Sequence, residues 1–198
     1  MPSASALRFV NIRETAGWSK DAEAAAPKVA ALIAAAAEPE PDFRVVSLSS
    51  EGATLIYGSD ERAIETAKLL KDQLEVTVLL KEGTETVPPS RVTEFPLFRG
   101  SIKSVKGYLG AFELTVANRA LPSPSSRGNL QFAPAGEDVR MQCDVLIDVS
   151  GGTPLFQSAD LRAGYLRADP RDQAAILRMV LEARDLVGEF DRPRYITF

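Results

Sequence analysis

The stretch from Thr54 to Leu80 constrains the fold of this 198-residue chain more than any other part. It begins with a short apolar strand at Thr54–Tyr57. It continues through Ile64–Leu74, where apolar residues recur at helical spacing, and ends in an apolar strand at Val76–Leu80. A strand, a helix and a second strand in this order form a βαβ unit, whose two strands are parallel and whose crossover is right-handed. The stretch therefore predicts an α/β protein built on a parallel sheet.

The turn between the first of these strands and the helix, Gly58-Ser59-Asp60, is a candidate cofactor-binding site. A dinucleotide-binding fingerprint needs three glycines here: for the tight turn, for the approach of the pyrophosphate and for close packing of the helix. Only Gly58 is present, because Asp60 stands at the second position and Ala63 at the third. Two interpretations stay open: an empty scaffold, or an altered nucleotide site at a helix N-terminus, where backbone amides favour an anion.

A second glycine turn, Ser150-Gly151-Gly152, follows the apolar strand Asp144–Val149. Ligands of α/β proteins bind at the carboxyl ends of strands, so Gly151 and Gly152 are further candidate cofactor contacts. An ordinary turn that needs a positive φ angle is the other interpretation. Asp144 and Asp148 lie four residues apart on the strand, so both point to one face of the sheet.

The chain divides at the acidic, proline-rich segment Glu38–Asp42. Residues 1–40 predict an N-terminal appendage, a short strand at Arg8–Ile12 followed by an alanine-rich helix in which Pro27 marks a kink or the first turn. Residues 43–198 predict a Rossmann-like α/β domain of three layers, a parallel sheet between helices, with an antiparallel β-meander excursion at about residues 92–141. A last helix is expected at Pro170–Val187, capped by Asp169.

The composition of the chain argues against several classes of function. The net charge is −4, with acidic and basic residues interspersed, so we expect no nucleic acid as partner. No apolar run is long enough to span a bilayer, so we expect no membrane contact. Histidine is absent, which removes the commonest general base and metal ligand, and we predict no catalytic and no metal-binding residue. The single cysteine, Cys143, fits a cytoplasmic protein and a buried apolar environment.

Four blocks of sequence then point to a known family. They are Val10–Glu14 with Trp18, Gly58–Ala63, Gly107–Leu114 and Cys143–Gly152. In this order and spacing they resemble the central domain of bacterial 4Fe-4S ferredoxin-type proteins related to the flavin-containing subunit of heterodisulfide reductase. The second block aligns with the flavin fingerprint of that family, and a family cysteine falls at Ala16.

The resemblance implies an iron–sulfur electron-transfer protein whose 4Fe-4S motifs lie beyond a segment like Val187–Phe198. A cluster needs four thiolates, so none is expected in this chain. The chain is then expected to be a non-catalytic scaffold or docking domain, and its partner a redox protein or an adjacent iron–sulfur domain. One alternative is a degenerate flavin- or nucleotide-binding oxidoreductase module that would hold FAD, and another is a domain for assembly of a redox enzyme. Trp18 is expected either in a core or at an interface with another domain.

Overall fold

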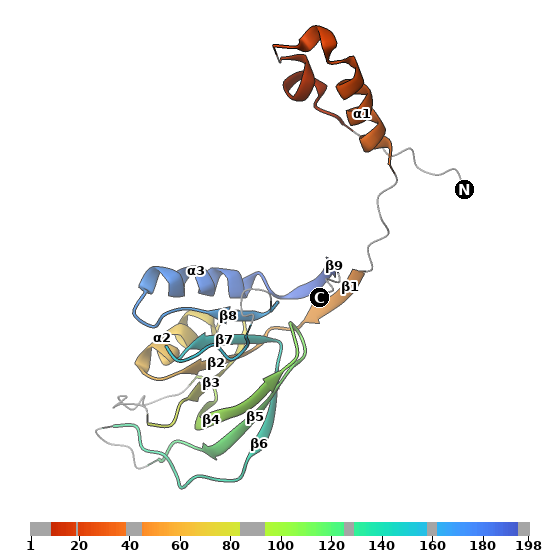
Figure 1. Cartoon of the computed structure of the whole chain (residues 1–198). Helices are drawn as coiled ribbons and strands as arrows, with labels where there is room; N and C mark the ends of the chain where they lie inside the picture. Colours follow the sequence, from red (N-terminus) through yellow and green to blue (C-terminus); the bar gives the residue numbers. More distant parts are fainter. Residues whose placement is uncertain are drawn as a thin grey trace. The chain divides into compact units, whose positions relative to one another are not determined.

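The computed structural model describes residues 9–18, 20–38, 45–83, 94–124, 129–157 and 162–193 (Figure 1). Contacts divide the chain into two compact units, Met1–Arg44 and Val45–Phe198. Most of the predicted linker, residues 39–42, lies outside the described residues.

The first unit is helical. It contains two short turns of helix, η1 (Arg13–Gly17) and η2 (Ala22–Ala24), and one α-helix, α1 (Ala26–Ala37). Pro27 lies in the first turn of α1, so the helix begins there and is not kinked. The strand predicted at Arg8–Ile12 is wrong for the described residues 9–12. Instead, the Asn11 side chain accepts a hydrogen bond from the N–H of Glu14 at 3.1 Å, in the turn that leads into η1.

The second unit is built on one mixed sheet of seven strands in the order β6-β5-β4-β3-β2-β7-β8. The neighbours from β4 through β3, β2 and β7 to β8 pair in parallel, whereas β5 and β6 run antiparallel to their neighbours. A separate antiparallel ribbon pairs β1 (Val45–Ser50) with β9 (Gly188–Pro193). The sheet strands are β2 (Ala53–Gly58), β3 (Glu75–Leu80), β4 (Leu97–Lys106), β5 (Phe112–Ala120), β6 (Val139–Cys143), β7 (Val145–Val149) and β8 (Tyr165–Arg167).

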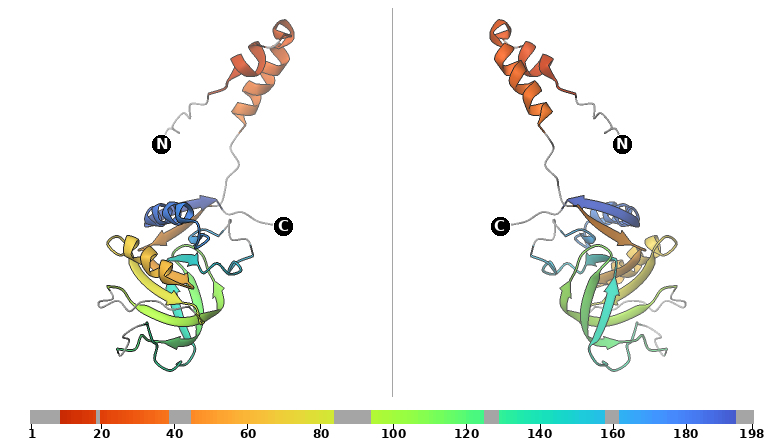
Figure 2. Two further views of the ribbon diagram at one scale, coloured as in Figure 1. Left: turned by 90° about the vertical axis from the view of Figure 1, so that its left-hand side faces the viewer. Right: turned by 90° about the vertical axis from the view of Figure 1, so that its right-hand side faces the viewer.

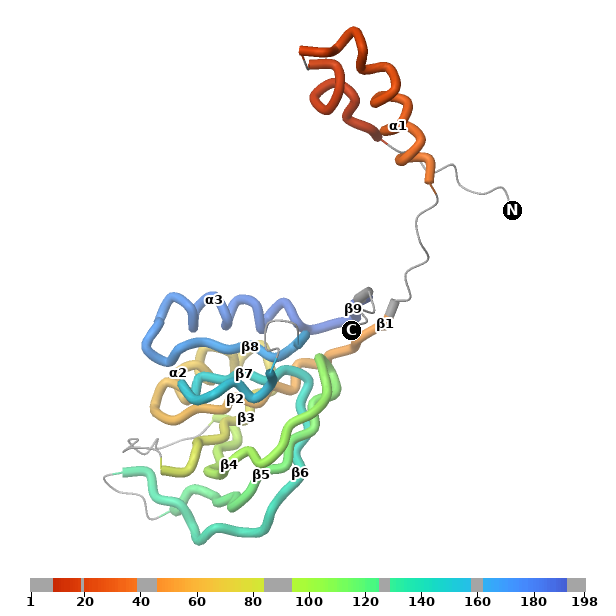
Figure 3. Tube along the Cα trace, in the orientation of Figure 1, coloured from red at the N-terminus to blue at the C-terminus, as the bar shows by residue number. Residues whose placement is uncertain are grey.

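This sheet curls until its β6 end meets β2. Only Asp144 separates β6 from β7, so one run of chain pairs first with β5 and then with β2 (Figure 3). At the junction the N–H of Asp144 donates to the carbonyl of Ala53 at 2.7 Å. Its carboxylate oxygen Oδ2 accepts from the N–H groups of Glu51, Gly52 and Ala53 at 2.7, 3.0 and 3.2 Å. Strands β2 to β7 therefore enclose a barrel-like interior.

Alternate residues of the strands face two separate cores. The interior core contains Leu55, Tyr57, Leu79, Phe112, Leu114, Val116, Cys143, Leu146 and Tyr165. The outer face is covered by α2 (Glu61–Leu70) and α3 (Gln173–Arg184). Both helices bury their apolar faces against the alternate residues of β2, β3 and β7, among them Ile56, Val78 and Ile147. Figure 2 shows α2 and α3 on the same side of the sheet.

The prediction of a Rossmann-like three-layer α/β domain is therefore wrong. The described residues are mostly β, with nine strands and only three α-helices. No helix of the described chain covers the interior side, which the curled strands β5 and β6 and the segment after β7 close instead. The predicted meander is not an excursion from the sheet. Its strands β4, β5 and β6 continue the sheet and bend it over.

Aspartate side chains cap the N-termini of the two helices of this unit and determine where each helix begins. The Asp60 side chain accepts from the N–H of Arg62 at 3.0 Å, which starts α2. Helix α3 begins at Gln173, because the Asp172 side chain accepts from the N–H of Ala175 at 2.9 Å. The predicted cap, Asp169, instead accepts from the N–H of Arg171 in the preceding turn, so the predicted start at Pro170 was too early.

Candidate functional site

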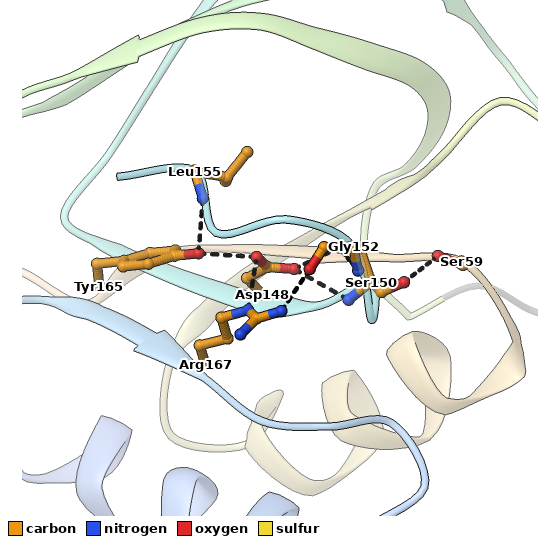
Figure 4. Close-up of polar contacts among 7 residues, drawn as sticks. All are labelled: Ser59, Asp148, Ser150, Gly152, Leu155, Tyr165 and Arg167. Atoms are coloured by element: carbon orange, nitrogen blue, oxygen red, sulfur yellow. Dashed lines mark hydrogen bonds and ion pairs between the residues drawn. The ribbon is translucent and has the colours of Figure 1, made fainter. Parts of the chain in front are cut away.

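The two glycine turns singled out in the sequence lie together at the carboxyl ends of the neighbouring strands β2 and β7. Gly58 pairs with Val149 at the ends of these strands. The hydroxyl of Ser59 donates to the carbonyl of Ser150 at 2.6 Å and ties one turn to the other (Figure 4). Ser59 and Ser150 are 91 positions apart in the chain and meet because parallel neighbouring strands end at the same edge.

In the first turn, Gly58 and Asp60 have roles in the fold itself. A Cβ atom on Gly58 would lie 2.4 Å from the Cβ of Ala63, so only glycine lets α2 pack this closely on β2. The Asp60 carboxylate accepts from the N–H of Arg62 and lies 3.4 Å from the Arg62 guanidinium. The anion at this helix N-terminus is therefore the protein's own carboxylate.

Asp148 organises the second turn from inside the sheet. Its side chain is fully buried, and its Oδ1 accepts from the hydroxyl of Ser150 at 2.6 Å and from the Ser150 N–H at 3.0 Å. Its Oδ2 accepts from the hydroxyl of Tyr165 at 2.7 Å and lies 3.6 Å from Nε of Arg167. A buried carboxylate is costly unless it is paired and hydrogen-bonded, and both oxygens of Asp148 are. The side chains converge from β7 and β8 (Figure 4).

The same groups fasten the chain after the turn. The Tyr165 hydroxyl accepts from the N–H of Leu155 at 3.1 Å, while the guanidinium of Arg167 donates to the carbonyl of Gly152. Gly151 has a φ of 68°, the left-handed region that glycine adopts without strain. The N–H of Gly152 donates to the Ser150 hydroxyl at 3.3 Å. The turn is thus closed on itself by its own hydrogen bonds.

Burial and the nearby carboxylate change the ionisation of two tyrosines. Burial, more than the hydrogen bond to Asp148, raises the pKa of Tyr165 far above its ordinary value. Burial also raises the pKa of Tyr57, with a smaller contribution from the charge of Asp148. Both phenols are therefore protonated at neutral pH, and the Tyr165 hydroxyl can donate to Asp148.

These turns fit a flavin dinucleotide poorly. A diphosphate at the N-terminus of α2 would compete with the Asp60 carboxylate for the N–H of Arg62 and would meet its negative charge. The amides of Ser150 and Gly152 already donate within the protein. Of the five predicted contacts, Gly58, Ser59 and Asp60 lie in the first turn, and Gly151 and Gly152 in the second.

An iron–sulfur cluster has no donor set in the part of the chain that the structure describes. No group of three or more His, Cys, Asp or Glu side chains there could hold a metal ion. Cys143 is buried in the interior core, and burial raises the pKa of its thiol to about 12. The description of this chain as ferredoxin-like is therefore wrong, as is the description as Rossmann-like, because the chain is β-rich and its described residues offer no cluster site.

Sequence reasoning found the two turns but missed the residues that join them. The sequence groups Asp148 with Asp144 because of their spacing, yet the two carboxylates bind different parts of the protein. Asp144 closes the sheet against the turn before β2, and Asp148 binds Tyr165 and Ser150. A charged residue inside the apolar run of β7 was the available signal, since a buried charge needs partners. Nothing in the sequence connects Tyr165 and Arg167 with the two turns, because β8 is only three residues long.

A second candidate site is the surface of the first unit. Phe9, Trp18 and Ile33 expose 88%, 70% and 53% of their surface, and Ile12 is also exposed. Among the described residues of this unit only Ala16 is buried. The guanidinium of Arg13 stacks over the Trp18 ring at 5.4 Å, leaving the rest of the ring open. Trp18 is therefore not in a core of this unit.

No protein-family model matches the chain, and a search of curated proteins finds no significant match to it. Within the described residues, no helix is both long and apolar enough to cross a bilayer.

Proposed function

We propose that this chain is a non-catalytic docking and scaffold domain of an iron–sulfur electron-transfer protein. The observation that carries the proposal is the exposure of Phe9, Trp18 and Ile33 on the small helical unit. Large apolar side chains gathered on one small unit are typical of protein interaction sites. Aromatic residues, and tryptophan above all, contribute most of the binding energy at such sites.

The energetics of the first unit support a docking role. Helix α1 has no buried residue. An isolated helix of this length is marginal in water, and most helical stability in proteins comes from packing of an apolar face. A unit that buries only Ala16 among its described residues gains stability when a partner covers Trp18 and Ile33. The partner we propose presents an apolar groove that accepts these two side chains.

The sequence resembles proteins related to the flavin-containing subunit of heterodisulfide reductase, and this resemblance supports an iron–sulfur protein or domain as the partner. We propose that it is a domain or protein that carries 4Fe-4S clusters, since this chain has one cysteine and a cluster takes four thiolates. Electron transfer would then take place in the partner. The second unit supports such a scaffold role, because the hydrogen bonds of Asp148 and Asp144 hold its turns in place.

The test is co-purification of the tagged chain from its native cells, followed by assay of acid-labile sulfide and by electron paramagnetic resonance of the bound fraction. We expect the wild-type chain to bring down an iron–sulfur protein and the double variant W18A/I33A to lose at least about tenfold of it, as removal of two central contacts should. Leu177→Ala is the matched control, since Leu177 is an exposed apolar residue of α3 in the other unit. Equal recovery with W18A/I33A would contradict the proposal.

A flavin- or nucleotide-binding module is the competing function, favoured by the meeting of the two turns through Ser59 and Ser150. Titration with FAD, followed by thermal unfolding, decides between the two. A ligand that binds only the folded chain must raise its unfolding temperature. We expect no shift with saturating FAD. A shift that the double variant S59A/G152A abolishes would instead support the flavin module.

A further inference from the structure

The segment Gly151–Gln157, which we call the strap, is the cover of the barrel-like interior next to β7 and β8. It has neither helix nor strand, and none of its residues is fully buried. Phe156 nevertheless lies against the interior core: its ring is 5.9 Å from that of Phe112 and 5.1 Å from that of Tyr165. The Arg162 guanidinium stacks on the same ring at 4.8 Å. The strap thus covers apolar side chains in the place where a helix would otherwise lie.

Few polar contacts hold the strap closed. One is the hydrogen bond from the N–H of Leu155 to the Tyr165 hydroxyl, and another joins Arg167 to the carbonyl of Gly152. Tyr165 is itself held by Asp148, which is anchored in the central part of the sheet. The strand beneath is different, because every residue of β7 is buried. Segments with few buried apolar contacts open with a lower free energy than the strands of a core.

We propose that the strap is a latch that opens as a unit while the sheet stays folded. The hydrogen bond from the Leu155 N–H to the Tyr165 hydroxyl holds it closed. Opening uncovers the rings of Phe112 and Tyr165, and closing returns the Phe156 ring to its place against both of them. Gly151, with its positive φ, and Gly152 lie at the start of the strap and form the hinge. The inference does not depend on the docking function of the first unit.

Amide hydrogen exchange of the full chain, read residue by residue by NMR, tests the latch. In the wild type we expect the Leu155 amide to exchange at least about 100-fold faster than the amides of β3, because it opens locally. In Tyr165→Phe the ring contacts remain, but the hydrogen bond from the Leu155 N–H to the Tyr165 hydroxyl is lost. The Leu155 amide should therefore exchange about tenfold faster again, while the β3 amides change much less. Exchange of Leu155 at the rate of global unfolding would overturn the proposal.

Two further variants keep the test decisive. Arg167→Gln removes the donor to Gly152 and should also speed exchange at Leu155, so it replaces Tyr165→Phe if that variant does not fold. Ser47→Ala is the matched control, because its hydroxyl bonds to Asp191 at 2.7 Å in the β1–β9 ribbon and has no part in the latch. Acceleration of all amides alike by either latch variant would mean that the strap and the sheet open together, which contradicts a latch.

Discussion

At the scale of single residues, Gly58 and Gly152, two of the three glycines proposed as cofactor contacts, differ in what they do for the fold. A Cβ on Gly58 would overlap Ala63, at 2.4 Å, whereas on Gly152 the nearest atom would be the Ser150 hydroxyl at an ordinary 3.5 Å. We expect Gly58→Ala to lower the free energy of unfolding by about 1–3 kcal/mol through overpacking. Gly152→Ala is the matched control and should change it by less than about 0.5 kcal/mol. Urea unfolding of the two variants measures both values, and equal effects would contradict the packing role of Gly58.

Cys143 makes the stability of the second unit depend on alkaline pH. Burial raises the pKa of its thiol from 9.0 to about 12 in the folded chain. Above the lower value the unfolded chain releases a proton that the folded chain keeps, so stability is full below about pH 9 and falls as the pH rises. The slope approaches about 1.4 kcal/mol per pH unit.

The measurement is the free energy of unfolding of the wild type and of Cys143→Ala between about pH 8 and pH 10. The difference between the two proteins should shrink as the pH rises, because the variant lacks the thiol. Tyr57 and Tyr165 are present in both proteins, so their raised pKa values cancel in the comparison. A difference that is independent of pH would contradict a buried, protonated Cys143.

At the scale of elements, Asp144 closes the curled sheet by accepting three backbone N–H groups of the turn before β2. We expect Asp144→Ala to lower the free energy of unfolding by about 2–3 kcal/mol, since these donors lose a charged acceptor. Asp138→Ala is the control, because Asp138 makes an exposed ion pair with Lys103 and should cost less than about 1 kcal/mol. Chemical unfolding gives both values, and similar losses in the two variants would show that Asp144 does not close the sheet.

The sequence predicts the individual elements of this unit well and their layering poorly. Periodicity at Thr54–Leu80 identifies β2, α2 and β3, because apolar spacing is a local property of the chain. That both α2 and α3 cover one face is not encoded in either helix alone. It follows from the curl of β4 to β6, which fills the other face, and from the junction at Asp144.

In the candidate site, too, the sequence predicts the local turns but not the residues that come from elsewhere in the fold. Glycines after strands mark Gly58 and Gly151 in the sequence, since strand-to-loop turns often need glycine. Their neighbours Tyr165 and Arg167 come from a short strand whose position beside β7 depends on the whole sheet. What remains hidden in the sequence is therefore which side chains complete the turns, and with it the fact that the turns bind one another.

At the scale of the whole molecule, the chain combines a second unit with two buried cores and a first unit with almost no core among its described residues. Among the described residues the first unit exposes the large apolar side chains of Phe9, Ile12, Trp18 and Ile33, whereas the seven-stranded sheet exposes no large apolar side chain. The proposed docking function would account for this contrast, because a partner that covered the first unit would supply the packing that its described residues lack.

The fluorescence of Trp18 reports directly on whether the first unit has a free docking surface, because Trp18 is the only tryptophan in the sequence. The full chain, purified without a partner, is compared with the same chain in denaturant by emission wavelength and by acrylamide quenching. We expect native Trp18 to emit and to be quenched nearly as it is in the unfolded chain, since 70% of its surface is exposed. A blue-shifted, protected emission from the isolated native chain would show that Trp18 is already buried, and would contradict a free docking surface.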